Sequence, residues 1–417
     1  MEVDERRLRE NMLTNGEFGA VASEGHGRTV LTGSEADKRA REHLVTKMHG
    51  LDMAVRVDVV GNIVGRWTPD SADPGAAPVA AGSHLDSVPE GGIFDGLLGI
   101  YGALEAVRAI QESDRKPEHP LEVVSFTEEE GTRFGVGLLG SSVATGQRNT
   151  DEALSLTDDS GTTLETHLES IGFRGENRLD ASAWDAWLEL HPEQSTQLEN
   201  AGYQAGVVSA ITGLRRYGVE FGGEANHAGG VRMGDRSDAF VAASTFVTDI
   251  NRAARDVVAD GHDFAVATVG SAAVEPNASN VVPRRVELGL DIRDTNTETI
   301  KELVRRAQQS LARIEQEYGV ETQLTKRHMI DPAEMSDRCR GAIEAAGTEH
   351  GVETLAVRSG GGHDTMNVAR VTDAGLLFTP SQDGISHSPA EWTDWEDCAT
   401  CTRMLAEALA DLAGAGH

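Results

Sequence analysis

The sequence predicts an α/β protein built on a mainly parallel sheet, with a ferredoxin-like domain inserted into it. Short apolar runs alternate with helical patterns near both ends of the chain, which is the order that gives a parallel sheet. From about residue 211 the pattern changes to β-α-β-β-α-β, the split unit of ferredoxin-like folds. A length of 417 residues also favours two domains. We therefore expect one discontinuous domain over 1–210 and 329–417, and an insert over 211–328.

The first part of the chain supplies two helices and then strands. Helical spacing covers residues 4–20 and 34–50, and Ser34 can cap the second helix. Short apolar strands follow at 57–60, 62–64, 79–81 and 121–126, with a helical stretch at 97–112. Open parallel sheets place ligands at the carboxyl ends of their strands, so polar residues there are candidates for a site.

The insert and the returning segment follow in order. The expected elements of the insert are strand 212–223, helix 237–256, strands 264–273 and 284–293, helix 297–317 and strand 320–328. The chain then returns with a helix over 334–350, a glycine-rich loop over 357–363, a strand over 375–378 and a final helix from about Asp394. The insert can act as a lid over the first domain.

The charge is strongly acidic: Lys+Arg 37 against Asp+Glu 68 gives a formal net charge of -31. Such a chain repels nucleic acid and anionic membranes, which argues against both as partners. Arginine far outnumbers lysine, and an acidic, lysine-poor surface suits a very salty cytoplasm, where the Debye length is about 3 Å at 1 M salt. We expect a halophilic source; an ordinary acidic cytosolic protein is the alternative.

Compartment signals favour the cytoplasm. The charged N-terminus lacks the apolar core of a secretory signal, and no stretch approaches 18 apolar residues. Cys339, Cys398 and Cys401 are too few for a disulfide framework. The Cys398/Cys401 pair has CxxC spacing, but without a second pair we interpret it as two cysteines on one buried helix face.

Five short segments, far apart in the chain, offer imidazole and carboxylate ligands without thiolate: Gly82–Asp86, Phe94–Gly96, Thr127–Gly131, Leu190–Pro192 and Ile385–Ser388. Zinc and manganese accept this ligand set, and three protein ligands per ion leave positions open for water. A single carboxylate, here Asp95, can bridge two ions while His and Glu complete each one. The set predicts a two-metal hydrolase. The run Glu128–Glu130 could otherwise be a solvated acidic face.

Five longer motifs resemble those of one known family, in the same order along nearly the whole chain: Gly82–Gly96, Phe126–Phe134, Leu188–Gln194, Pro276–Pro283 and Gly384–Glu391. The chain resembles the amidase, hydantoinase and carbamoylase branch of the M20 dinuclear metallopeptidase superfamily. This branch contains N-carbamoyl-L-amino-acid hydrolases, allantoate amidohydrolases and ureidopropionases.

The resemblance implies two divalent ions per subunit, zinc or else manganese or cobalt. It assigns His84, Asp95 and His191 to one ion, and Asp95, Glu130 and His387 to the other. It makes Glu129 the general base, which needs a carboxylate that holds no metal. Gly131 fixes this register among three consecutive glutamates. Asp86 is spaced to hold the second ring nitrogen of His84 and set its tautomer.

The resemblance also implies residues that handle the substrate. It places Gln194, His227, Asn280 and Arg293 around it, with Arg293 pairing with a carboxylate. His227 is expected to reach the partner subunit's site and to stabilise the developing oxyanion, which implies a homodimer built through the inserts. Gly362 and His363 belong to a loop that either holds the substrate or is a flexible turn. Pro192 and Ser195 depart from the family pattern near Gln194.

The predicted function is hydrolysis of a C–N bond in a linear carbamoyl or ureido amide, with an N-carbamoyl-L-amino acid as the first candidate substrate. This is an activity of the EC 3.5.1 or 3.5.3 type. The alternatives are an allantoate amidohydrolase or ureidopropionase, an M20 aminoacylase or peptidase, and a non-catalytic metal-binding homologue. No ligand position and no base is missing from the motifs, which disfavours the last alternative.

Overall fold

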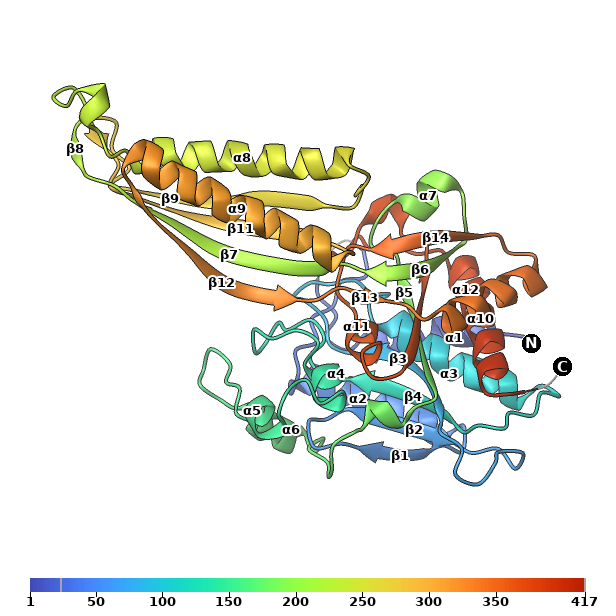
Figure 1. The fold of residues 1–417 in the computed structure, drawn as a ribbon. Helices are drawn as coiled ribbons and strands as arrows, with labels where there is room; N and C mark the ends of the chain where they lie inside the picture. Colours follow the sequence, from blue (N-terminus) through green and yellow to red (C-terminus); the bar gives the residue numbers. More distant parts are fainter. Residues whose placement is uncertain (23–24, 416–417) are drawn as a thin grey trace. The chain divides into compact units, whose positions relative to one another are not determined.

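The computed structural model describes residues 1–22 and 25–415, and it divides the chain into two compact units. Unit 1 consists of Met1–Ala210 and Glu334–His417, and unit 2 of Ile211–Ala333. Unit 2 ends beyond residue 328, the end expected from the sequence, because strand β12 continues to Ile330. Unit 1 is therefore discontinuous in sequence (Figure 1).

Unit 1 contains a nine-stranded sheet. Its strands are β1 (Ala54–Val57), β2 (Ile63–Trp67), β3 (Val79–His84), β4 (Leu121–Phe126), β5 (Ala186–Pro192), β6 (Ala205–Ile211), β13 (Ala333–Glu334), β14 (Thr354–Ser359) and β15 (Asp373–Thr379). The order is β1-β2-β4-β3-β5-β15-β6-β13, with β14 paired to β6. The pairs β4/β3, β3/β5 and β5/β15 are parallel, whereas β1/β2, β2/β4 and β15/β6 are antiparallel. The predicted α/β class with a largely parallel central sheet is confirmed.

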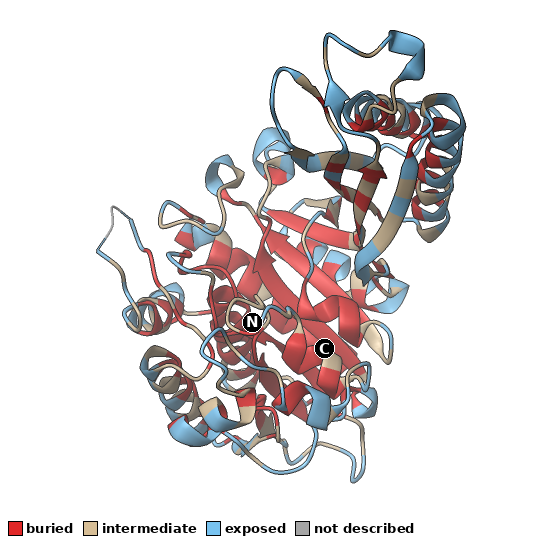
Figure 2. Ribbon diagram, turned by 90° about the vertical axis from the view of Figure 1, so that its left-hand side faces the viewer, coloured by how far each residue is buried: buried red, intermediate tan, exposed pale blue. Residues whose placement is uncertain are grey.

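Every residue of β3, β4 and β5 is buried, because helices and loops cover both faces of a parallel sheet (Figure 2). One face packs against α1 (Glu5–Gly16), α3 (Leu97–Gln111), α10 (Asp337–His350) and α12 (Trp395–Leu412), with α2 (Glu35–His49) extending this core. The other face packs Trp184 and Trp187 against residues of α4 (Leu139–Ala144) and α11 (Asp364–Val368). The remaining short helices are α5 (Thr150–Leu154), α6 (Leu164–Ile171) and α7 (Gln197–Ala201).

Unit 2 has a four-stranded antiparallel sheet of order β12-β7-β11-β9. Its elements are β7 (Gly213–Gly222), α8 (Ala239–Ala259), β9 (Val266–Glu275), β11 (Arg285–Asp294), α9 (Thr297–Tyr318) and β12 (Glu321–Ile330). Alternate residues of β7 and β11 are buried, and they form one core with the inner faces of α8 and α9. The short strands β8 (Asn226–His227) and β10 (Val281–Val282) pair with each other as a separate ribbon.

Within the described residues, no helix combines the length and the apolar content that crossing a membrane requires.

Candidate metal centre

Four of the predicted ligands come from the carboxyl ends of the parallel strands or from the loops that follow them. His84 ends β3, Glu130 follows β4, His191 lies at the end of β5, and His387 lies beyond β15. Asp95 stands in the loop between β3 and α3. The parallel order β4-β3-β5-β15 makes these ends neighbours at one edge of the sheet. His191 belongs to the fully buried strand β5.

The five predicted ligands form two groups that share Asp95. In the first group, Nε2 of His84 and Nε2 of His191 each lie 3.2 Å from Oδ1 of Asp95. In the second group, Nε2 of His387 lies 3.4 Å from Oδ2 of Asp95 and 3.5 Å from Oε2 of Glu130. The ligand atoms of each group lie within 4.8 Å of one another. Asp95 thus presents one oxygen to each group, as a bridging carboxylate would.

The electrostatics of this cluster fit a bound cation. Burial raises the pKa of Glu130 to about 7, and the neighbouring charge of Asp95 adds to the effect. Oε1 of Glu130 is buried and has no hydrogen-bond partner among the described residues. Burial opposes ionisation of Asp95, but hydrogen bonds from His191, His387 and His84 outweigh it and hold the pKa well below its usual range. Carboxylates and imidazoles gathered without thiolate suit zinc or manganese.

Glu129 lies beside the first ligand group but is a member of neither ligand group. Its Oε2 is 3.8 Å from Nε2 of His84. Burial raises its pKa well above the usual range, against the opposing effect of His84. Glu128 points elsewhere: its φ is +55°, and its Oε1 accepts the backbone N–H groups of Arg133 and Phe134 at 2.7 and 2.9 Å. Of the three consecutive glutamates, only Glu130 joins a ligand group.

Asp86 meets the second ring nitrogen of His84, as predicted, but through its backbone carbonyl and not through its carboxylate. Nδ1 of His84 lies 3.0 Å from the backbone carbonyl oxygen of Asp86 and 3.7 Å from its Oδ1. The carboxylate instead accepts the N–H groups of Glu129 and Glu130 on its two oxygens, at 3.2 and 3.1 Å. These backbone donors follow β4 directly, next to the end of β3, and they satisfy a carboxylate that is only 3% exposed.

Two predicted substrate residues lie against the ligands. Gln194 has a φ of +57°, and its Nε2 donates to Oδ2 of Asp95 at 2.8 Å and to Oγ of Ser386 at 3.0 Å. His363 is buried, with its ring centroid 4.6 Å from that of His191. Burial holds the pKa of His363 well below its usual range, with the charge of His191 adding to the effect. Gly362 precedes His363 in the loop between β14 and α11.

Comparison with known proteins shows the family. The model of peptidase family M20/M25/M40 matches residues 80–411. The chain belongs to this family. An amidase of the hydantoinase/carbamoylase family from Burkholderia multivorans has a crystal structure that superposes with a TM-score of 0.91, at 34% identity over 99% of this chain and 98% of that one.

Two curated relatives of this M20 protein also cover nearly all of it. An N-carbamoyl-L-amino-acid amidohydrolase of Paenarthrobacter aurescens is 36% identical over 393 residues, which is 93% of this chain and 94% of the relative. An allantoate amidohydrolase of Bacillus subtilis strain 168 is 32% identical over 406 residues, 95% of each chain. The M20 protein is thus placed in the hydantoinase/carbamoylase branch.

The predicted substrate residues of unit 2 fall into two separate places. His227 pairs with Val281 in the β8/β10 ribbon, which places it beside Asn280. Arg293 lies near the far end of β11, opposite Leu214, whereas Arg285 at the ribbon end lies opposite Gly222. Arg285 and Arg293 are eight residues apart, which is roughly 26 Å at about 3.3 Å per residue. The structure brings His227 and Asn280 together and holds Arg293 away from them.

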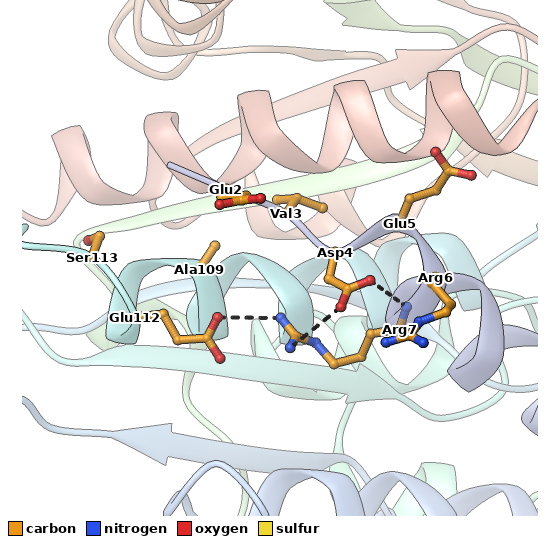
Figure 3. Close-up of a pocket in the computed structure, with 9 residues that line it drawn as sticks. All are labelled: Glu2, Val3, Asp4, Glu5, Arg6, Arg7, Ala109, Glu112 and Ser113. Atoms are coloured by element: carbon orange, nitrogen blue, oxygen red, sulfur yellow. Dashed lines mark hydrogen bonds and ion pairs between the residues drawn. The ribbon is translucent and has the colours of Figure 1, made fainter.

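A cavity of about 700 Å³ lies elsewhere in unit 1, at the start of α1 and the end of α3 (Figure 3). Arg6 and Arg7 are the cations that line it, and Arg7 already pairs with Asp4, Glu105 and Glu112. None of the predicted ligands lines it, so we do not assign it to the reaction.

Sequence reasoning missed two buried glutamates near the ligands. Glu189, on β5, accepts hydrogen bonds from Ser83 and from the N–H and hydroxyl of Thr365, so its carboxylate is already satisfied. Glu391 accepts hydrogen bonds from the loop that carries Asp95. Glu391 stands in a quoted motif, and its position four residues after His387 was the available signal.

Proposed function

We propose that the protein is a metal-dependent amidohydrolase that cleaves a linear carbamoyl or ureido amide, with N-carbamoyl-L-amino acids as the first candidates. The observation that carries this proposal is the pair of ligand groups sharing Asp95, with Glu129 beside them. The relative of Paenarthrobacter aurescens supports the substrate class. Allantoate is the second candidate, because a relative of similar coverage is named for that substrate.

Different residues of the chain bind the ions, transfer protons and position the base during hydrolysis. His84, Asp95 and His191 would hold one divalent ion, and Asp95, Glu130 and His387 the other, with zinc, manganese or cobalt as candidates. When bound, such ions polarise the scissile carbonyl and make water a better nucleophile near neutral pH. Glu129 takes a proton from the attacking water and returns it to the leaving nitrogen. Asp86 keeps Glu129 in place by accepting a hydrogen bond from the backbone N–H of Glu129.

The substrate's carboxylate pairs with Arg293, whose planar guanidinium can donate two parallel hydrogen bonds. Gln194, Gly362 and His363 would line the substrate near the ions, where Gln194 already reaches Asp95. In the structure Arg293 pairs with Asp291, with Nε 2.8 Å from Oδ1, so a bound carboxylate must compete with Asp291.

We propose that the active form is a homodimer through unit 2. His227 and Asn280 belong to the β8/β10 ribbon, next to the Arg285 end of β11, and that end lies roughly 26 Å along the strand from Arg293. One small substrate does not span that length of strand. A second copy of the chain would let one chain supply Arg293 and the other His227 and Asn280 to a single site. The outer surface of unit 2 suits such pairing: β9 is an edge strand, and Phe240, Val241 and Val247 of α8 are exposed.

We place the enzyme in the cytoplasm of a salt-loving cell. The three cysteines are free and buried, which suits a reducing interior. The charge of -31 favours a salty medium and disfavours nucleic acid and anionic membranes as partners.

The test is an activity panel on the purified, Mn²⁺-loaded protein. N-carbamoyl-L-amino acids, allantoate, ureidopropionate and N-acetyl-L-amino acids are offered at equal concentration, and ammonia or free amine is measured. The proposal expects the highest kcat/KM on a carbamoyl-amino acid. Preference for the acetyl substrates would favour the aminoacylase alternative, and inactivity on the whole panel with two ions bound would favour a non-catalytic homologue.

A further inference from the structure

Glu391 is a buried carboxylate that turns back from the His387 segment toward the loop of Asp95. It is 1% exposed. Its Oε2 accepts the backbone N–H of Phe94 at 2.9 Å and that of Asp95 at 3.2 Å. A carboxylate this buried is costly without donors, and here the donors are the main chain of a ligand-bearing loop. Glu391 itself belongs to neither ligand group.

The second oxygen of Glu391 faces the His387 segment. Oγ of Ser386, the residue before His387, lies 3.3 Å from Oε1 of Glu391 and 3.3 Å from Oδ2 of Asp95. Glu391 therefore connects two segments almost 300 residues apart in sequence, and each of them supplies a ligand to the second group.

Gly92 shows how closely this loop approaches Glu391. A Cβ added at Gly92 would lie 2.0 Å from Oε2 of Glu391 and 2.5 Å from its Cβ, so only glycine fits. The backbone that leads to Asp95 therefore runs directly against the Glu391 side chain.

We propose that Glu391 is a positioning residue that fixes Asp95 relative to His387 and so sets the affinity of the second ion, the one held by Asp95, Glu130 and His387. The inference rests on the proposed two-metal centre. The histidines of the first group have their own supports: Nδ1 of His84 meets the carbonyl of Asp86, and Nδ1 of His191 meets the carbonyl of Pro192, both at 3.0 Å. Loss of Glu391 should thus weaken the second ion more than the first.

Two conservative variants separate the reach of the side chain from its charge. Glu391→Asp keeps the charge but is one methylene shorter, so it no longer reaches the N–H groups of Phe94 and Asp95. Glu391→Gln loses the charge but keeps a carbonyl oxygen for those N–H groups, and its amide can donate to Ser386. Gly92→Ala disturbs the same contact from the opposite side. Glu122→Asp is the matched control, because Glu122 is 2% exposed and accepts a hydrogen bond from Trp184 away from the ligands.

The measurement is equilibrium dialysis of each full-length, metal-stripped protein against Mn²⁺, with bound metal determined by mass spectrometry. Wild type, Glu122→Asp and Glu391→Gln should each bind two ions, with the same pair of affinities in all three proteins. Glu391→Asp and Gly92→Ala should bind the second ion about 10–100-fold less tightly than wild type, which is the usual effect of removing a residue that orients a ligand.

Equal weakening by Glu391→Gln and Glu391→Asp would overturn the role of the backbone hydrogen bonds, and so would unchanged binding by Glu391→Asp. A wild-type protein that binds fewer than two ions would overturn the two-metal centre itself, which distinguishes that failure from a failure at Glu391.

Discussion

The carboxylate of Asp86 accepts the backbone N–H of Glu129, with Oδ1 3.2 Å from the nitrogen. Its other oxygen accepts the N–H of Glu130 in the same way. Asp86 lies two residues after His84, so it fixes the loop of the proposed base relative to the loop of a first-group ligand. The arrangement requires two acceptor oxygens at once.

Asp86→Asn should therefore lower kcat about 10–100-fold with little change in KM, because one oxygen becomes an NH₂ group facing an N–H donor. Steady-state kinetics at saturating Mn²⁺ measure this. Asp58→Asn is the control: Asp58 is 3% exposed and accepts the N–H groups of Val60 and Leu179, so its variant should lose thermal stability but keep kcat. Wild-type kcat in Asp86→Asn would contradict the assigned role.

Glu129→Gln should cut turnover by roughly 10²–10⁴ while leaving two ions bound, because Glu129 moves protons and holds no metal. Turnover and metal content are measured on the same preparation. Glu128→Gln is the matched neighbour: its oxygen can still accept the N–H groups of Arg133 and Phe134, so activity should stay close to wild type. Loss of an ion in Glu129→Gln would mean that Glu129 is a ligand.

The central sheet could be predicted because apolar strands alternate with helical patterns, as at 79–81, 97–112 and 121–126. Strand β5 was missed, since its run Ala186–Pro192 contains Glu189 and His191, which are polar but buried. Residues 57–60 were expected as a strand, but β1 ends at Val57, where a turn held by Asp58 begins. Propensity cannot foresee such buried polar residues, because tertiary hydrogen bonds compensate them.

The ligand types could be predicted from the motifs, but their orientation could not. The spacing of His84 and Asp86 fits a carboxylate–imidazole contact, yet the carboxylate has two N–H donors within reach from a loop more than 40 residues away. Glu391 was missed for the same reason, since its partners Phe94 and Asp95 are close to it only in the folded chain. Side-chain to backbone contacts of this kind leave no periodic signal in the sequence.

Arg293→Lys should lower kcat/KM for carboxylate substrates at least tenfold. The kcat/KM for a substrate whose carboxylate is amidated should change little. Lysine keeps the charge but not the planar pair of donors. The two substrates are compared side by side. The control is Arg285→Lys, which alters a bidentate pair with Glu220 at the other end of β11. It should leave kcat/KM unchanged for both substrates. Equal losses on both substrates would make Arg293 structural.

Activity and melting temperature should both rise from tens of millimolar to molar KCl. A net charge of -31 repels itself in dilute buffer, and concentrated salt screens that repulsion over about 3 Å at 1 M. Thermal melts and initial rates across a KCl series, with the ions kept saturating, provide the measurement. Full stability and activity in dilute buffer would remove the inference of a halophilic source and leave the hydrolase proposal intact.

The separation of His227 from Arg293 within unit 2 leads to a test by complementation. If His227 serves the partner's site, His227→Ala and Glu129→Gln homodimers are each nearly inactive. In a mixed dimer, one site carries both faults and the other carries neither. When the two variants are mixed in equal amounts, about half of the dimers are mixed, and each mixed dimer has one intact site out of two. About a quarter of all sites are then intact, so activity should recover to about a quarter of wild type. Subunit exchange is followed by native mass spectrometry, and complete exchange without recovery would place His227 in its own chain's site or outside the reaction.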